Sequence, residues 1–454
     1  MRRRPNRSMR VSDASAVMAA TEDGGGAETP KPGRRICVLT SNFPRWEGDS
    51  TTPFVLHLAQ DLVAAGWEVE VLAPHAPGAA GHEILGGVAV TRFRYLWPEA
   101  AESVCYQGGA LINLRRNPLN WLKLPALVAA EAIALWRLAR RRRYDLIHAH
   151  WILPQGFVGV LVGRSLGIPC LITVHGGDVF ALAGRLLGAF KRYALTRAAA
   201  VTVNSSATEA AVRAVAPDIA ELRRIPMGAR VPRPPDADAL RDIRARYVPD
   251  GAPLLVFVGR LIEEKGVGDL LRAIALLHGE GLGAHAMFLG EGQERARFEA
   301  QAVELGLAEA AHFLGWIAPE EVPAYLAAAD LFVAPSKTGR DGWIEGQGLT
   351  IVEAQLAGTP VIATRTGGIV DLVQDHETGL LVSPGLPREI ASAVTALCGD
   401  ADLASRIGAQ ANAHAQAHFT RARSRSSFEQ AYNSAIGGCA ANTDAPAGQR
   451  TTQR

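Results

Sequence analysis

Two carboxylates and two glycines mark the stretch with the clearest chemical pattern, GWIEGQGLTIVEA, in which Glu345 and Glu353 stand eight positions apart. A short apolar run precedes this stretch and a helical pattern follows, so Glu345 falls in the loop and Glu353 about one turn inside the helix. Gly346 and Gly348 let the backbone approach a ligand closely, and the first helical amides, from Leu349 onward, are unpaired donors. The stretch therefore predicts a cradle for an anion, with carboxylates available to ligand hydroxyl groups. A helix start with two solvated acids is the alternative interpretation.

Two cations follow the first apolar run of the second half, in the sequence VGRLIEEKG, where Arg260 and Lys265 precede a helical pattern. A diphosphate gains negative charge as a glycosidic bond to it breaks, and fixed cations with helix-terminal amides stabilise that charge without a metal. The pair therefore predicts a diphosphate site. In the alternative, the stem of Lys265 lies along apolar surface and Arg260 pairs with Glu263 or Glu264.

A histidine and an aspartate follow a strand of the first half, in the sequence VHGGD, as His175 and Asp178. His175 could donate a hydrogen bond to a transferred sugar or a departing phosphate, and Asp178 could orient a sugar or acceptor hydroxyl. A lone histidine at a strand end is more often structural, and that interpretation stays open from the residues alone.

Three further patterns suggest metal ligands but have simpler explanations. His148, His150 and Trp151 form the sequence HAHW, for which we expect packing or acceptor contact because no third ligand is nearby. Two Asp-x-Asp sequences, at 236–238 and 400–402, each begin a helix after Pro or Gly, so helix capping explains both. We expect a protein that needs no metal.

Alternating strands and helices position these residues. Strands are predicted at 35–40, 68–73, 88–93, 144–148, 170–175 and 200–203 in the first half, and at 254–259, 286–290, 312–314, 331–334, 361–363 and 380–382 in the second. Helices between them are expected at about 52–65, 121–142, 155–166, 184–197 and 206–214, with terminal helices near 400–434. This alternation is typical of βαβ units and parallel sheets. We therefore predict an α/β protein of two doubly wound, Rossmann-like domains that face each other across a cleft, with ligands at the strand ends.

The predicted boundaries follow composition. Prolines concentrate between 226 and 253, which marks the break between the domains. The organisation is a disordered tail at 1–33, an acceptor-side domain at 34–230, a linker at 231–252 and a donor-side domain at 253–415, followed by a terminal helix at 416–436 that packs back on the first domain and a disordered tail at 437–454.

Composition excludes several classes of protein. The 454 residues are 48% hydrophobic with a net charge of +2, which gives neither a disordered chain nor a nucleic-acid footprint. Five cysteines in no paired pattern favour reduced thiols, and no signal sequence or bilayer-spanning segment is evident, so a cytoplasmic protein is expected. A basic amphipathic helix at 121–143, with Arg137 and arginines at 140–143, predicts either a peripheral dock for anionic lipid on the inner face of the membrane or a solvated last turn.

Together the motifs resemble glycosyltransferase family 4. The matching sequences are Gly-Arg-Leu with Lys-Gly, Pro-Ser, Glu-Gly-x-Gly-Leu with Glu-Ala, Gly-Thr-Pro-Val-Ile-Ala, Gly-Gly and Thr-Gly-Leu-Leu-Val-x-Pro, densest between 253 and 384. The resemblance implies the two-domain GT-B fold and a retaining transferase of the group 1 type. It also implies that Arg260 and Lys265 hold the donor diphosphate, that Glu353 binds the ribose, and that Glu345 contacts the transferred sugar.

The resemblance extends to further contacts and to partners. It implies that amides near Gly348 and Leu349 bind donor phosphates, that His175 acts in catalysis, and that the loop NFPRWEGD, with Gly48, lies on the acceptor side. The implied partners are a nucleotide-diphosphate sugar as donor substrate, with no separate cofactor, and a glycan or lipid-linked acceptor in cell-surface polysaccharide or glycolipid synthesis. A sugar-nucleotide-binding regulator without turnover and a dinucleotide-dependent oxidoreductase are the alternatives. An oxidoreductase of this kind would need the motif Gly-x-Gly-x-x-Gly directly after a strand, and this chain does not have it there.

Overall fold

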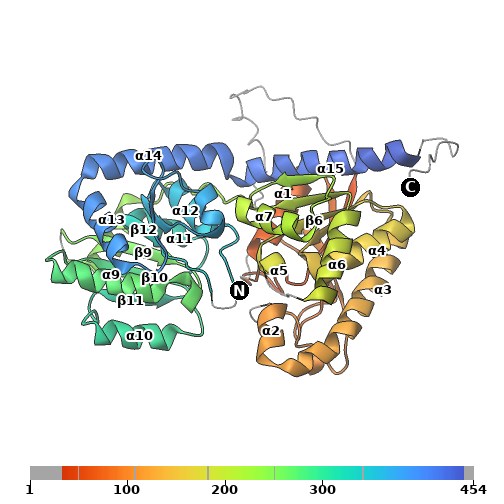
Figure 1. Ribbon diagram of the computed structural model, residues 1–454, viewed down its shortest axis with the longest axis horizontal. Helices are drawn as coiled ribbons and strands as arrows, with labels where there is room; N and C mark the ends of the chain where they lie inside the picture. Colours follow the sequence, from red (N-terminus) through yellow and green to blue (C-terminus); the bar gives the residue numbers. More distant parts are fainter. Residues whose placement is uncertain are drawn as a thin grey trace, which may run out of the picture.

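The computed structural model describes residues 33–49, 51–106, 109–180, 184–249, 251–339 and 342–443, with side chains to 439. Two lobes, each built on one sheet, stand side by side in Figure 1. The tails predicted at 1–33 and 437–454 lie mostly outside the described residues. Where the second of them is described, a helix continues to Thr443, which corrects the predicted end of the terminal helix at 436.

The first lobe contains an eight-stranded sheet of order β3-β4-β2-β1-β5-β6-β7-β8. The strands are β1 (Arg35–Leu39), β2 (Glu68–Pro74), β3 (His82–Leu85), β4 (Val88–Phe93), β5 (Leu146–His150), β6 (Cys170–Val174), β7 (Ala200–Val203) and β8 (Leu222–Arg224). Its helices are α1 (Pro53–Ala64), α2 (Ala110–Arg116), α3 (Leu124–Arg142), α4 (Phe157–Leu166), α5 (Gly177–Phe180), α6 (Arg185–Arg197) and α7 (Ser206–Val215), with short helical segments η1 (Glu99–Ala101), η2 (Pro118–Lys123) and η3 (Ile152–Gly156). The central strands are buried on both faces, as continuous apolar runs between two helix layers require.

The second lobe contains a parallel six-stranded sheet of order β11-β10-β9-β12-β13-β14. Its strands are β9 (Leu254–Val258), β10 (His285–Leu289), β11 (Ala311–Gly315), β12 (Leu331–Ala334), β13 (Val361–Thr364) and β14 (Leu380–Val382). Its helical elements are α8 (Ala237–Tyr247), η4 (Glu263–Lys265), α9 (Val267–Gly279), α10 (Arg295–Glu304), α11 (Val322–Ala328), α12 (Leu349–Ala357), η5 (Gly367–Asp371), α13 (Pro387–Gly399) and α14 (Ala401–His418). The strand order reverses between β9 and β12, and ligands of such sheets bind at the carboxyl ends beside that reversal.

The C-terminal helix α15 (Arg421–Thr443) leaves the second lobe and lies along the first, nearly in line with α14 (Figure 1). Phe428 and Tyr432 are fully buried and share a core cluster with residues of β1 and β2. The Tyr432 hydroxyl contacts Nδ1 of His148 at 2.8 Å. The terminal helix therefore completes the core of the first lobe.

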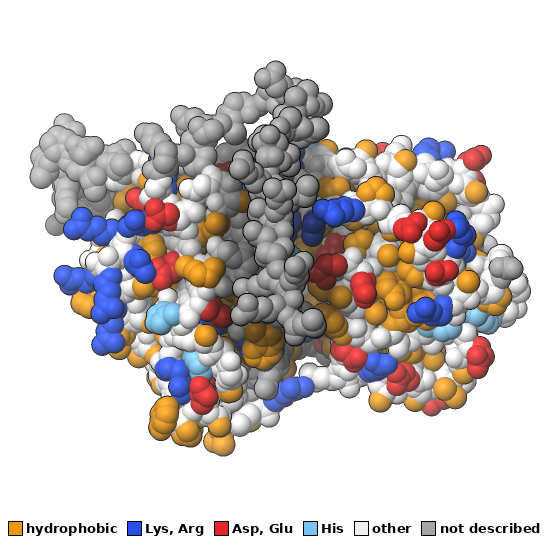
Figure 2. All heavy atoms as spheres, turned by 180° about the vertical axis from the view of Figure 1, so that it is seen from behind, with side chains coloured by type: hydrophobic (Ala, Val, Ile, Leu, Met, Phe, Trp, Pro, Cys, Tyr) orange, Lys and Arg blue, Asp and Glu red, His pale blue; other side chains and the backbone are white. Residues whose placement is uncertain are grey.

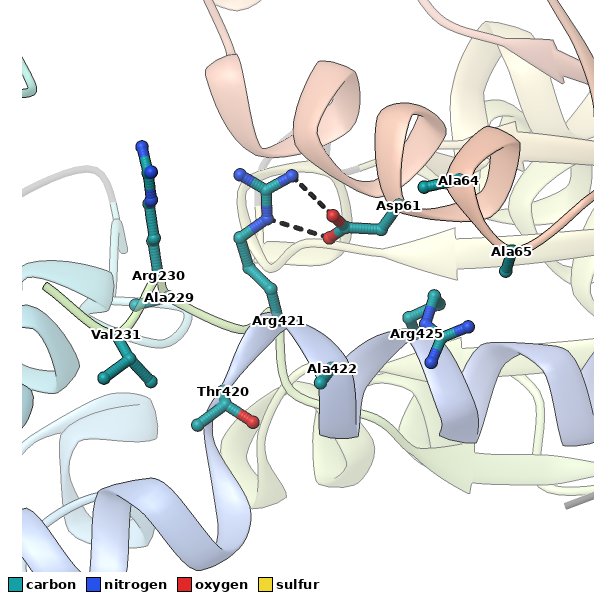
Figure 3. A pocket seen from close by; sticks show the side chains of 10 residues that line it. All are labelled: Asp61, Ala64, Ala65, Ala229, Arg230, Val231, Thr420, Arg421, Ala422 and Arg425. Atoms are coloured by element: carbon teal, nitrogen blue, oxygen red, sulfur yellow. Dashed lines mark hydrogen bonds and ion pairs between the residues drawn. The ribbon is translucent and has the colours of Figure 1, made fainter. Parts of the chain in front are cut away.

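The chain passes between the lobes twice, and the two crossings are hydrogen-bonded to each other. Ala229 N donates to the carbonyl of Phe419 at 2.9 Å, and Arg421 N donates to the carbonyl of Ala229 at 2.9 Å. The Arg421 guanidinium also forms a bidentate ion pair with Asp61 of α1 (Figure 3). Beside these crossings lies a pocket of about 650 Å³, open between α1 and α15.

Three elements differ from the prediction. The stretch 231–252, expected to be a linker, contains α8, whose Tyr247 packs with the second lobe's core. The edge strands β3 and β8 were not predicted, because short, half-exposed strands lack a continuous apolar run. Strand β5 extends to His150, two residues beyond the predicted end, so His150 lies within the sheet.

Candidate active site

Lys265 and Glu345 come together where the sheet order of the second lobe reverses. Lys265 ends η4 after β9, Glu345 lies in the loop after β12, and the lysine Nζ forms an ion pair with Glu345 Oε2. Their side chains are 18% and 13% exposed, so the pair is half-buried but reachable. Ser336 Oγ donates to the same carboxylate oxygen at 3.4 Å, and the Trp343 ring lies 5.7 Å from Lys265 Nζ. The structure thus joins one predicted cation to one predicted acid.

Arg260 is exposed at the same strand end and has no ion pair within the part of the chain that the structure describes. Its predicted alternative partner, Glu263, is paired instead with Lys337 and Arg297. Those two cations lower the pKa of Glu263 to about 2 by hydrogen bonding to the carboxylate. The second cation of the predicted pair therefore remains available to a ligand.

The glycine loop serves two purposes. Gly348 caps α12 in the left-handed region, with φ of 90°, and no side chain occupies the first amides of the helix, which begins at Leu349. Gly346 has a different role, because an added Cβ there would lie 2.4 Å from the carbonyl oxygen of His175 in the first lobe. We predicted that Gly346 admits a ligand; the structure shows that it admits the backbone of the opposite lobe.

Gln347 fastens the same loop to the first crossing between the lobes. Its buried amide accepts a hydrogen bond from Met227 N at 2.9 Å and donates one to the Met227 carbonyl at 2.7 Å. Gly368 N donates to the carbonyl of Glu345 at 2.9 Å and holds the other side of the loop. The position of Glu345 is therefore tied to the crossing.

Glu353 lies in the second turn of α12 and is half-buried. Burial raises the pKa of Glu353 to about 7, and no charged partner opposes this effect. The carboxyl group therefore changes charge near neutral pH, an uncommon property that is frequent in ligand sites.

His175 follows β6 and faces this loop from the first lobe. Its Nε2 lies 2.9 Å from Nδ1 of His150, and its ring also packs against Phe54 and Trp151 at centroid distances of 5.0 and 5.2 Å. Burial lowers the pKa of His175 to about 3, so the imidazole is neutral. The predicted catalytic histidine is thus a neutral group beside the glycine loop.

Asp178 was predicted to orient a sugar or acceptor hydroxyl, and the structure gives it another task. Its carboxylate accepts hydrogen bonds from Ile152 N at 2.9 Å and from His175 N at 3.2 Å. The residue is only 5% exposed. Asp178 therefore positions the loops that follow β5 and β6, which corrects the expected acceptor contact.

Gly48 lies in an exposed loop after β1, with φ of 82°. Asp49 accepts hydrogen bonds from both the backbone and the guanidinium of Arg45, at 2.8 Å each, and closes this loop. The acceptor-side role of Gly48 stays a prediction.

The capping interpretation of the two Asp-x-Asp sequences is confirmed. Asp236 accepts from Asp238 N at the start of α8, and Asp400 accepts from Leu403 N at the start of α14. His148 is packed between Thr173 and Tyr432, as a structural residue would be. Among the residues the structure describes, no three His, Cys, Asp or Glu side chains are arranged to hold a metal ion.

Comparison with known proteins identifies the family. The model of the glycosyl transferase 4-like domain matches residues 51–228, and that of the glycosyl transferases group 1 matches residues 240–414. The 2-deoxystreptamine N-acetyl-D-glucosaminyltransferase of Streptomyces fradiae is 32% identical over 411 residues, which cover 82% of this chain and 91% of that protein. The chain belongs to the group 1 glycosyltransferases. This confirms the resemblance to family 4 and leaves the oxidoreductase alternative without support.

Solved structures confirm the GT-B fold of this glycosyltransferase. Sucrose-phosphate synthase of Thermosynechococcus elongatus superposes with a TM-score of 0.71 at 24% identity, over 89% of this chain and 100% of that one. The Anabaena protein HepE, in complex with UDP, superposes with a TM-score of 0.69 at 20% identity, over 88% and 100% of the two chains. At these identities the similarity concerns the fold.

Gln347 of this glycosyltransferase is not among the predicted site residues, and His150 is predicted only to pack or to contact an acceptor. Gln347 stands inside the motif, but its partners are backbone atoms that no motif records. His150 follows from strand register, because β5 and β6 are neighbours and His150 pairs with Thr173, two residues before His175. Side chains two residues apart share a sheet face, so that register could have suggested the contact.

Proposed function

We propose that this glycosyltransferase moves a sugar from a nucleotide-diphosphate donor to an acceptor hydroxyl, with retention of the anomeric configuration. The observation that carries the proposal is the meeting of Lys265 and Glu345 beside the uncapped start of α12. Cations and free amides suit a diphosphate, and the carboxylate suits sugar hydroxyls. HepE, which shares the fold, was solved with UDP, and this supports a nucleotide donor.

In the donor-free protein Lys265 and Glu345 neutralise each other. A bound donor would replace this ion pair with contacts of its own. Lys265 and Arg260 would form ion pairs with its diphosphate. Glu345 would accept hydrogen bonds from its sugar, and Glu353 would accept them from its ribose. Such an exchange leaves no charge unpaired in a half-buried site, where an isolated charge is costly. Binding would therefore place the bond to be broken between the cations and the acceptor side.

Retention by a front-face displacement fits these residues. They supply charge stabilisation and positioning, and Glu345 is engaged by Lys265 instead of being aimed as a nucleophile. The departing phosphate would then assist the removal of the acceptor proton. Analysis of the product anomer by NMR tests this mechanism, and a trapped glycosyl-enzyme on Glu345 would contradict it.

A thermal-shift screen against UDP-, GDP- and ADP-sugars tests donor use. The matching donor should raise the melting temperature of the native protein, and Lys265→Ala should abolish the shift. Lys123→Ala is the control, because Lys123 is a half-buried lysine of the first lobe that donates to Ser103. A donor shift that survives in Lys265→Ala would remove the diphosphate role of this residue.

We further propose that catalysis needs no metal, since the cations and helix amides already meet the charge of the departing diphosphate. Turnover should persist in EDTA. Loss of turnover in EDTA with recovery in magnesium would overturn this part of the proposal.

We also propose that the acceptor is met at an anionic membrane surface, in cell-surface polysaccharide or glycolipid synthesis. The outer face of α3 supports this, because Ile133 and Trp136 are 50% and 41% exposed and stand beside the exposed Arg137 and Arg140. In Figure 2, Lys and Arg side chains gather along the outer edge of the first lobe. No helix among the described residues is both long and apolar enough to span a bilayer. An exposed tryptophan beside arginines suits the headgroup layer.

Vesicle co-sedimentation tests the membrane contact. Binding to vesicles with anionic lipid should fall strongly in Arg137→Glu/Arg140→Glu. It should persist in Arg388→Glu/Arg406→Glu, which makes the same charge change at exposed positions of the second lobe. Equal binding by the two double variants would end the membrane proposal.

A further inference from the structure

The ring of His175 is held by a second histidine, His150, which is fully buried at the end of β5. The planes of the two rings are nearly parallel, with an angle of 10° between them. Their centroids are 5.2 Å apart and Nδ1 of His150 lies 2.9 Å from Nε2 of His175, so each nitrogen points along the line between the rings. The contact is therefore an in-plane hydrogen bond between two imidazoles.

Both rings are neutral, and this restricts the position of the protons. Burial lowers the pKa of His175 to about 3 and places the pKa of His150 well below its usual value. A neutral imidazole carries one N–H and one lone pair. A hydrogen bond between the two rings therefore contains one proton, on either Nδ1 of His150 or Nε2 of His175.

The surroundings of His150 decide between these two arrangements. Its other nitrogen, Nε2, is buried and has no hydrogen-bond partner among the described groups. If His175 donated the proton, His150 would carry its own N–H on this isolated Nε2. A buried N–H without an acceptor is rarer and costlier than a buried lone pair without a donor. His150 therefore keeps its proton on Nδ1 and donates to His175.

We propose that His150 is a positioning residue that fixes His175 in the tautomer with its proton on Nδ1, which makes His175 a hydrogen-bond donor toward the donor substrate and not a base. The Nε2 lone pair of His175 is occupied by His150, while its Nδ1 has no partner among the described residues. His175 itself is half-buried, unlike His150. The catalytic use of this N–H rests on the function proposed above, with a sugar hydroxyl or a departing phosphate oxygen as its acceptor.

Nitrogen NMR of the substrate-free protein labelled with ¹⁵N-histidine tests the tautomer directly. The resonances of the two rings are assigned by their disappearance in His175→Asn and His150→Asn. Between pH 6 and 8 the proton of His175 should reside on Nδ1. A proton on Nε2 of His175 would overturn the proposal, whatever the enzyme is found to transfer.

Two substitutions at His150 distinguish the effect of its N–H group from the effect of the ring's volume. An asparagine amide places an N–H near the position of Nδ1, whereas alanine removes it. Hydrolysis of the nucleotide sugar found by thermal shift should fall about 10- to 100-fold in kcat in His150→Ala, with KM nearly unchanged, and should recover in His150→Asn. Equal losses in both variants, with melting temperatures also lowered, would show that the ring only packs and would overturn the proposal.

The two proposals can fail separately. If His175→Ala retains full turnover, the catalytic role of His175 is wrong, but the NMR result still decides its tautomer. If no nucleotide sugar binds, the proposed function is wrong and the tautomer is again decided by NMR alone.

Discussion

The two sides of the candidate active site differ in their electrostatics. On the first lobe His148, His150 and His175 are neutral and fixed by hydrogen bonds, and Asp178 is buried against backbone amides. On the second lobe the groups of the site are charged, and Lys265 is paired with Glu345. The first side is thus ordered before a ligand arrives, whereas the second side must exchange an internal ion pair for ligand contacts.

We propose that this difference divides binding and orientation between the lobes. Charged partners can be exchanged for a charged ligand at little cost in unpaired charge, which suits the donor. Buried neutral groups that are already held in place need little reorganisation during the reaction, which suits orientation of the reacting atoms. The following predictions test this division.

The largest effect is expected from removing charge on the second lobe. Glu345→Gln keeps the size of the side chain but removes the partner of Lys265 and of the sugar, and we expect turnover to fall about 100- to 1000-fold. Glu377→Gln, at an exposed position of the same lobe, should leave turnover unchanged. Steady-state rates of donor hydrolysis or transfer measure both variants. Comparable rates in the two would show that charge on this side is dispensable.

The next effect concerns a neutral group of the first lobe. Burial raises the pKa of Glu131 in α3 to about 8, while Gln155 donates to it at 3.0 Å. The folded protein keeps this proton where the unfolded chain, near pKa 4.5, has lost it. The free energy of unfolding should therefore fall as pH rises from 5 to 8, by on the order of 3 kcal/mol. Urea unfolding of native protein and Glu131→Gln measures this.

In Glu131→Gln the contribution of this group to the slope should disappear, so the difference between variant and native protein should grow with pH. Glu280→Gln, at an exposed position, should keep the native slope. A constant difference between Glu131→Gln and native protein would contradict a proton held by the fold.

A smaller effect should follow the charge of Glu353. Only the ionised carboxylate accepts hydrogen bonds from ribose hydroxyls through both oxygens, and the pKa of this group is about 7. Donor affinity should therefore be about tenfold weaker at pH 6 than at pH 8. Titration calorimetry with an intact nucleotide sugar measures this, and Glu353→Gln should flatten the profile. A native profile that is already flat would remove Glu353 from the donor site.

The smallest effect is expected from the hydrogen bonds by which Gln347 joins the glycine loop to the crossing between the lobes. Gln347→Met removes two hydrogen bonds to Met227, each contributing about 1 kcal/mol, and should weaken donor binding about fivefold by releasing the glycine loop. Gln301→Met is a matched control, because Gln301 donates to the Gly268 carbonyl within one lobe. Calorimetry measures affinity, and solution scattering should show a larger radius only for Gln347→Met. Unchanged affinity and radius would show that the tie is passive.

Much of the fold follows from apolar runs. The predicted strand at 331–334 matches β12, and that at 200–203 matches β7, because both are buried on each face. The hairpin of β3 and β4 was only half predicted, since β3 has the burial pattern of a solvent-facing edge. Helix α8 was overlooked because prolines surround it and none of its residues is fully buried.

The site was predictable where charge complements charge across neighbouring strand ends. Lys265 and Glu345 follow β9 and β12, which the strand order makes adjacent. Asp178 and Gly346 were misjudged because their partners are backbone atoms of distant segments, and a sequence does not display its own backbone. The tautomer proposed for His175 depends on the unpaired Nε2 of His150, and only the folded structure shows that this nitrogen has no partner among the described groups.

The placement of α15 has a consequence for synthesis on the ribosome. Phe428 and Tyr432 belong to the interior of the lobe that is translated first, yet they are translated only after the whole second lobe. Until the second lobe has been translated, the nascent first lobe lacks these side chains, and part of its hydrophobic core stays exposed to solvent. A chain that stops near residue 415 would therefore lack part of its first lobe, although the break comes after all the strands of the second lobe.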